Sequence, residues 1–175
     1  MCSLRRALFN KYSCKDIKVN ILDVLRQHLV KSLNGGQAFK PFSKALEGIK
    51  PELRNVRPRE ELHSVYEELE HMRIAQQDLL YFALKDEWES PEWPEGYWPK
   101  PDINVTDEMW KHSVDGFFND LSKAVEMVGN EDIDILSLIP RAKLTYLREI
   151  MIIIEHNAYH LGKIIDIRKS LKNWN

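Results

Sequence analysis

The sequence contains little cysteine, little glycine and no long apolar run. Cys2 and Cys14 are the only two cysteines in 175 residues, and they have no CxxC spacing. A disulfide framework or a thiolate zinc site is therefore not expected, and a reducing, cytoplasmic location fits. The seven glycines match a soluble helical composition. The apolar run from Ile150 to Ile154 is far too short to cross a membrane, so no membrane partner is expected.

The sequence also lacks a surplus of positive charge. It has 25 lysines and arginines against 27 aspartates and glutamates, which gives a formal net charge of −2. Nucleic acid is not expected as a partner, because proteins that bind it usually carry an excess of clustered basic residues. The N-terminal stretch has basic residues but no continuous apolar core, so it does not resemble a signal peptide. We interpret residues 1–15 as an extension and residues 16–175 as one domain.

Apolar residues recur at helical spacing in four long segments. The spacing predicts helices over about 16–34, 60–85, 106–129 and 145–171. The residues expected to be buried in the first two helices are Ile17, Ile21, Leu25, Leu29 and Leu33, then Leu62, Val65, Leu69, Met72, Leu79 and Ala83. No stretch shows the sustained alternation of a strand. The predicted fold class is therefore all-α, a four-helix bundle.

Two of the predicted connections are long. Residues 35–59 contain FKPFSKALEGIK, which predicts one short extra helix. The stretch from Ser90 to Asn104 contains four prolines, so it must be extended, and it is long enough to allow a crossover along the bundle. Residues 88–98 are rich in aromatic side chains. These side chains either line the entrance of a substrate pocket, cover one end of the bundle or contact a second copy of the chain. These residues are Trp88, Trp93, Tyr97 and Trp98.

The stretch EHNAYHLGKI, residues 155–164, places two histidines four positions apart in the last predicted helix. At this spacing His156 and His160 share one helical face, with Cβ atoms about 5–6 Å apart, so one metal ion could bind a nitrogen of each. Such a pair arises often enough by chance that a third ligand is needed to support a metal site.

Two histidines compete for the position of third ligand. His71 lies in the middle of the second predicted helix, at the border of its apolar arc, as the pair does in the last helix. His28 is also central in its helix and lies within the apolar arc. Helical geometry leaves these two nearly even, and either could instead be a core histidine bonded to a backbone carbonyl. His63 and His112 lie near helix ends and fit less well.

Three carboxylates fall close to the expected histidine cluster on the helical faces. Glu68 lies one turn before His71, Asp78 lies two turns after it, and Glu149 shares the stripe of His156. We interpret each mainly as a carboxylate that is solvated or orients a ligand imidazole, and only secondarily as a general base.

Glu68 and His71 also form an ExxH, the half-motif of di-iron bundles. A dinuclear site needs a second copy of this motif. The last helix has Ile153 and Asn157 at the corresponding positions, so a mononuclear site is expected.

Three segments resemble the DinB/YfiT-like superfamily of four-helix-bundle metalloenzymes, over about residues 16–175: EELEHMRIAQQDLLYF, SPEWPEGYWP and REIMIIIEHNAYHLGKIIDIRKSL. In such proteins a histidine of the second helix and an HxxxH pair of the fourth hold one divalent metal ion, commonly nickel or zinc. The resemblance therefore implies His71, His156 and His160 as metal ligands, with His71 chosen over His28. Lys163 is a departure, because similar sequences often have glutamine there.

The resemblance also implies a class of function. Some members are thiol S-transferases that use low-molecular-weight thiols, and others are hydrolases or isomerases. Three neutral imidazoles leave a coordination position for water or a thiolate, and they are expected to release the metal below about pH 6. The sequence therefore predicts a metal-dependent transferase or hydrolase acting on a small molecule. The alternative is a non-catalytic metal-binding or interaction bundle, such as a homodimer.

Overall fold

The computed structural model describes residues 20–100 and 103–174. These residues form five α-helices and no β-sheet, so the predicted all-α fold is confirmed for this part of the chain. The helices are α1 (Ile21–Asn34), α2 (Phe42–Leu46), α3 (Val65–Leu84), α4 (Asp107–Gly129) and α5 (Tyr146–Ser170), with two short 3-10 helices, η1 (Pro51–Leu53) and η2 (Glu95–Tyr97). The predicted extension, residues 1–15, and the first residues of the helix predicted over 16–34 lie outside the described residues.

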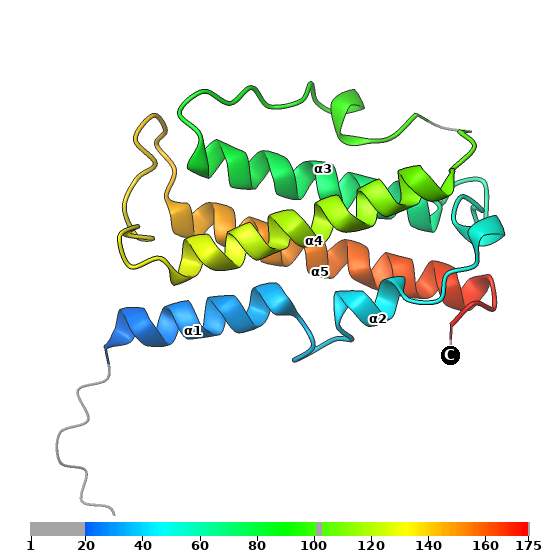
Figure 1. The fold of residues 1–175 in the computed structure, drawn as a ribbon, viewed down its shortest axis with the longest axis horizontal. Helices are drawn as coiled ribbons and strands as arrows, with labels where there is room; N and C mark the ends of the chain where they lie inside the picture. Colours follow the sequence, from blue (N-terminus) through cyan, green and yellow to red (C-terminus); the bar gives the residue numbers. More distant parts are fainter. Residues whose placement is uncertain (1–19, 101–102, 175) are drawn as a thin grey trace, which may run out of the picture.

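Helices α3, α4 and α5 form the three long members of a bundle, and α1 and α2 follow one another along its remaining side (Figure 1). α1 packs against α4 and α5, and α2 packs against α5. Helix α2 is the short extra helix that the sequence predicted between residues 35 and 59. Two short helices in line thus take the fourth place in the bundle.

The connection between α3 and α4 is a crossover. α3 and α4 run in the same direction, and α5 runs in the opposite direction (Figure 1). The described residues of the connection, 85–100 and 103–106, return along the bundle to the start of α4. The described residues confirm the crossover that the long connection allowed, although η2 (Glu95–Tyr97) interrupts the extended chain that the prolines predicted. The crossover brings Trp88 and Tyr97 onto α3.

The starts of α4 and α5 are set by threonine caps. The side chain of Thr106 accepts a hydrogen bond from the backbone N–H of Met109, and Thr145 does the same for Arg148. Such caps satisfy N–H groups that have no partner within the helix. Both helices therefore begin within a residue of the predicted positions.

Helix α3 begins later than predicted. The Ser64 side chain accepts from the N–H of Glu67, and the Glu67 carboxylate accepts from the N–H of Ser64, which forms a capping box. The helix therefore begins at Val65 rather than near residue 60. Leu62, expected to be buried in this helix, lies in the preceding turn and is 46% exposed.

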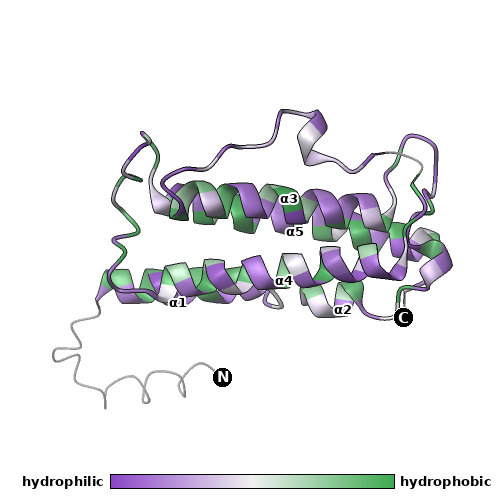
Figure 2. Cartoon of the chain, turned by 45° about the horizontal axis from the view of Figure 1, so that its top comes forward, coloured by the Kyte–Doolittle hydropathy of each residue, from purple (hydrophilic) through white to green (hydrophobic). Residues whose placement is uncertain are grey.

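The core lies between the helices, and Figure 2 shows apolar and polar residues distributed along every helix. Most residues expected in the core are buried, among them Leu29, Leu33, Leu69 and Met72. Ile21 is an exception at 82% exposed, because α1 begins beyond the ends of α4 and α5 (Figure 1). In the described ranges, no helix combines the length and apolar character that a membrane span requires.

Candidate metal centre

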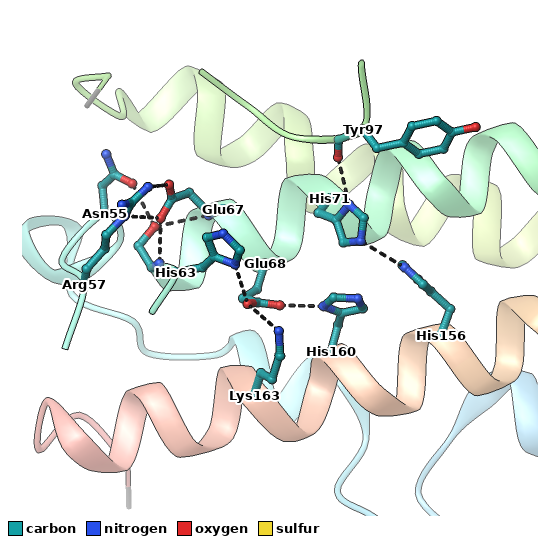
Figure 3. A network of polar contacts seen from close by, with 11 residues as sticks. Asn55, Arg57, His63, Glu67, Glu68, His71, Tyr97, His156, His160 and Lys163 are labelled. Carbon is teal, nitrogen blue, oxygen red and sulfur yellow. Dashed lines mark hydrogen bonds and ion pairs between the residues drawn. The ribbon is translucent and has the colours of Figure 1, made fainter. Parts of the chain in front are cut away.

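Three histidines from two helices meet between α3 and α5 (Figure 3). His71 belongs to α3, while His156 and His160 lie one turn apart on α5. One nitrogen of each ring lies within 4.8 Å of the other two, and the Nε2 atoms of His71 and His156 are 3.0 Å apart. The structure thus brings together the three histidines that the resemblance implied as ligands. Their binding of a metal remains a prediction.

A backbone carbonyl of the crossover holds the His71 ring. Nδ1 of His71 lies 2.8 Å from the carbonyl oxygen of Tyr97. A carbonyl can only accept a hydrogen bond, so Nδ1 of the neutral ring donates and Nε2 keeps its lone pair. Trp98 stacks on the same ring, with the ring centroids 3.9 Å apart and the planes within 1°. Both the tautomer and the orientation of His71 are therefore restrained.

Glu68 holds the imidazole of His160. Its Oε2 accepts from His160 Nδ1 at 2.5 Å, which leaves Nε2 of the neutral ring with a lone pair. Its Oε1 lies 3.1 Å from His63 Nδ1 and accepts from Lys163 Nζ at 3.3 Å (Figure 3). A carboxylate that binds the second nitrogen of a ligand imidazole fixes the ring and raises its basicity. Glu68 is therefore placed to support His160.

The pKa of Glu68 reflects opposing influences. Burial raises the pKa of this carboxyl, but the hydrogen bond and charge of His160, together with Lys163 and His63, outweigh burial. The pKa therefore lies below its ordinary value of 4.5. Glu68 is ionised at neutral pH, as a carboxylate that orients a ligand imidazole must be.

His156 completes the cluster from a half-buried position. Its Nδ1 is enclosed and has no hydrogen-bond partner among the described residues, whereas its Nε2 faces the Nε2 of His71. Two lone pairs 3.0 Å apart repel each other, so a proton or a cation must lie between these nitrogens. Without a cation, the neutral His156 ring can supply that proton from Nε2, and its enclosed Nδ1 is then left without a donor among the described residues.

Burial is the largest influence on the pKa of two of the histidines. Burial, followed by the charges of His160 and His71, lowers the pKa of His156 to about 4. Burial also lowers the pKa of His71, against the opposing effect of its bond to Tyr97. Both rings are therefore neutral at pH 7, which is the state in which imidazole binds metals. Because such rings take up protons only at lower pH, we expect the metal to be released below the pH of about 6 that the sequence predicted.

The spacing of His71 and His156 fits a first-row divalent ion, and the chemistry of the donors suits one. Two nitrogens that bind one ion at about 2.0–2.1 Å lie about 2.8–3.4 Å apart for bond angles from about 90° to 109°. The Nε2 atoms of His71 and His156, at 3.0 Å, fall within this range. Imidazole nitrogens suit zinc or nickel better than magnesium or calcium, which prefer oxygen. No fourth histidine, cysteine or carboxylate joins the cluster within the part of the chain that the structure describes.

The other histidines lie apart from the cluster or beside it. His28 and His112 are exposed on α1 and α4. His28 lies within the apolar arc of its helix in the sequence, yet its side chain is exposed, because an arc on a helical wheel does not say how far the neighbouring helices cover it. His63 lies 3.1 Å from Glu68 and packs against Trp98 in a tilted arrangement, with a centroid distance of 4.0 Å. His63 thus takes part in the support of the cluster, although its place near a helix end counted against it.

Of the three candidate carboxylates, Glu68 contacts the histidines and the other two have different contacts. Asp78 accepts from Trp88 Nε1 at 2.7 Å and from the Tyr97 hydroxyl at 2.6 Å. Glu149 is buried and pairs with Arg148 at 2.8 Å. The contact that sequence reasoning missed is the Tyr97 carbonyl, because a backbone acceptor leaves no signal in the side-chain pattern.

A family model matches most of the chain. The model of the DinB superfamily matches residues 37–164, a span that includes all three histidines, Glu68 and the crossover. The search of curated proteins gave no match, and neither did the search of solved structures. The matched span is shorter than the resemblance over residues 16–175, but it covers most of the chain. The chain therefore belongs to the DinB superfamily, as the resemblance predicted.

Proposed function

We propose that this protein binds one divalent metal ion, zinc or nickel, through His71, His156 and His160. We further propose that it is a metal-dependent transferase of the thiol S-transferase type, or a hydrolase, acting on a small molecule. The supporting observation is the convergence of three imidazole nitrogens while the second nitrogens of His71 and His160 face acceptors. A bound ion would supply Lewis acidity, lowering the pKa of a water or thiol that fills its open coordination position.

The surrounding residues would hold the ligands rather than move protons. Both oxygens of Glu68 already accept hydrogen bonds, so this carboxylate is committed to holding His160 in place. The Tyr97 carbonyl plays the same part for His71. We assign no general base, because a thiol or water on the metal would be activated by the ion itself.

A small substrate is consistent with the space beside the cluster. A cavity of about 330 Å³ is lined by Glu68, which holds His160, by Lys163 and by apolar side chains such as Leu62 and Ile167, although none of the three ligand histidines lines it. Cavities of this size hold small organic molecules. The cavity supports a small-molecule substrate and does not by itself distinguish transfer from hydrolysis.

Metal content tests the ligand assignment. The protein should be purified without a nickel column, and its metal measured by mass spectrometry after incubation with zinc or nickel. We expect about one equivalent in the wild type and none in His71→Ala, His156→Ala or His160→Ala. His28→Ala and His112→Ala are matched controls on the surface and should keep the full equivalent. Retention of metal by His71→Ala, or its loss from His28→Ala, would refute the assignment.

Cobalt substitution separates the enzymatic from the non-enzymatic alternative. An added small thiol should produce a sulfur-to-cobalt charge-transfer band if one coordination position is open. A spectrum that does not respond to thiol, water or azide would indicate a closed structural site. A screen for thiol transfer and for hydrolysis would then be done only on a protein that shows the open position.

A further inference from the structure

One buried carboxylate fastens the crossover to α3 at two points. We use the name strap for residues 85–100. Asp78 of α3 is 9% exposed, and each of its oxygens accepts a hydrogen bond from the strap. Trp88 Nε1 donates to Oδ1 at 2.7 Å, and the Tyr97 hydroxyl donates to Oδ2 at 2.6 Å. Asp78 therefore holds residues near both ends of the strap at once.

The part of the strap between these two points has little other support. Residues 92–96 are exposed, and the Trp93 side chain among them is 72% exposed. Burial, and then the hydrogen bond to Asp78, raises the pKa of Tyr97 to about 12, so its hydroxyl stays protonated and keeps donating at neutral pH. The polar contacts that hold the strap on α3 thus include the two bonds to Asp78 and the contact of the Tyr97 carbonyl with His71.

Tyr97 links this anchor to the histidine cluster. Its hydroxyl reaches Asp78, while its carbonyl oxygen lies 2.8 Å from Nδ1 of His71. Figure 3 shows the carbonyl directed at the His71 ring and the tyrosine ring extending away from the cluster. The next residue, Trp98, contacts the rings of both His71 and His63, at centroid distances of 3.9 and 4.0 Å. A shift of residues 97–98 would therefore remove the contacts that fix both the tautomer and the orientation of the His71 ring.

We propose that Asp78 is a positioning residue for the candidate metal centre. By holding Trp88 and Tyr97 it keeps the Tyr97 carbonyl on His71 Nδ1, so that His71 Nε2 faces His156. The consequence for metal affinity rests on the proposed function. The consequence for the His71 ring does not, because it concerns contacts within the chain alone.

The first test is nuclear magnetic resonance of the histidine rings in metal-free protein. The wild type should show a protected Nδ1–H signal, assigned to His71 by its absence in His71→Ala. We expect Asp78→Ala to lose this signal. Asp120→Ala is the control and should keep it, because Asp120 is a buried carboxylate that likewise accepts from a tyrosine hydroxyl, that of Tyr81, but makes no hydrogen bond to the strap. The Tyr81 side chain contacts the strap through its ring, whose centroid lies 5.1 Å from that of Trp88.

The second test is metal affinity, measured by competition with a chelator. Asp78→Ala should bind zinc about 10–100-fold more weakly, the range seen when a partner of a metal ligand is lost. Asp78→Asn keeps one acceptor oxygen and should recover part of the affinity. Asp120→Ala should stay within about twofold of the wild type even where its loss of stability is as large, because only Asp78 acts on the ring of His71.

Two outcomes would overturn the proposal: persistence of the His71 signal in Asp78→Ala, or an equal loss of zinc affinity in Asp120→Ala. If Asp78→Ala does not fold, Tyr97→Phe decides, because it removes the hydroxyl and keeps the carbonyl in the chain. The signal should then weaken, and an unchanged signal would contradict the proposal. If the wild type binds no metal, the proposed function fails and the ring signal alone decides the role of Asp78.

Discussion

Helix α3 carries polar side chains toward both α4 and α5, and the two sides are built differently. On the α4 side, Glu70 accepts from both Nε and Nη2 of Arg73, at 2.8 and 2.7 Å, and from the Ser113 hydroxyl at 2.6 Å. Further along, Asp120 accepts from the Tyr81 hydroxyl and from Lys123. Each carboxylate there meets donors, so these groups are satisfied within the fold.

On the α5 side, the hydrogen-bond acceptors at the centre of the cluster are not matched by donors in this way. The outer nitrogens of His71 and His160 face acceptors, so their inner nitrogens carry lone pairs. His156 turns a third nitrogen toward them, 3.0 Å from that of His71. The comparison teaches that burial of polar groups alone does not mark a site. The site is distinguished by hydrogen-bond acceptors that outnumber the donors offered by the described side chains. A bound metal ion would interact with the lone pairs of these acceptors.

Neutralising one carboxylate on each side of α3 tests whether the two sides differ in function. Glu68→Gln should weaken metal binding about 10–100-fold, because a neutral amide holds and polarises His160 less well than a carboxylate does. Glu70→Gln, on the α4 side, should leave metal affinity within about twofold and lower the free energy of unfolding by about 1–3 kcal/mol, through its lost bonds to Arg73. Chelator competition and urea unfolding measure the two effects. Equal effects of both variants on metal affinity would remove the distinction between the two sides.

The pH dependence of stability should also come from the α5 side. The pKa of His156 falls from its ordinary value of 6.5 to about 4 in the folded protein. Between these values the unfolded chain binds a proton that the folded chain does not, so the metal-free protein should lose stability as pH falls from 6.5 toward 4. The slope for one such histidine reaches about 1.4 kcal/mol per pH unit, and the lowered pKa of His71 adds in the same direction.

Urea unfolding at pH 7.5, 6 and 5 measures this loss. His156→Leu should reduce the slope, while His28→Leu, a control on the exposed side of α1, should keep it. A free energy of unfolding that does not change between pH 7.5 and 5 would show that the cluster is not held neutral by burial. Metal should correspondingly remain bound to a lower pH than the value of about 6 expected for ordinary imidazoles.

The smallest effect should come from Lys163. Its Nζ lies 3.3 Å from Glu68, and its side chain is 38% exposed. A half-exposed pair of this kind contributes little, so Lys163→Gln should change metal affinity by less than about threefold. Chelator competition measures this affinity, and the effect of Glu68→Gln in the same experiment serves as the reference. An effect as large as that of Glu68→Gln would mean that Lys163, and not only His160, sets the charge at Glu68.

Helix positions could be predicted from the sequence wherever local chemistry decides them. Apolar spacing and a threonine cap place the starts of α4 and α5 within a residue. The start of α3 was missed by several residues, because the apolar pattern continues through Leu62 whereas the capping box at Ser64 ends the preceding turn. Apolar periodicity indicates that a helix exists, and backbone hydrogen bonding decides where it begins.

The third histidine shows where sequence reasoning stops. His28 and His71 were nearly even on the helical wheel, and only the resemblance separated them. The structure buries His71 against α5 and leaves His28 exposed on α1. A wheel gives the apolar face of one helix, but it does not give which helix covers that face or how far the cover extends.

The sequence by itself determined that His156 and His160 share one face of a helix, because the geometry of an α-helix depends only on neighbouring residues. Tertiary structure decided the rest of the cluster. His71 and Glu68 reach it from α3 and the Tyr97 carbonyl reaches it from the crossover, both far from α5 in the sequence. They meet there through the path of the crossover and the packing of α3 on α5. The lowered pKa values of His71 and His156 likewise arise only after folding, because burial is their largest cause and an unfolded chain leaves every imidazole in water.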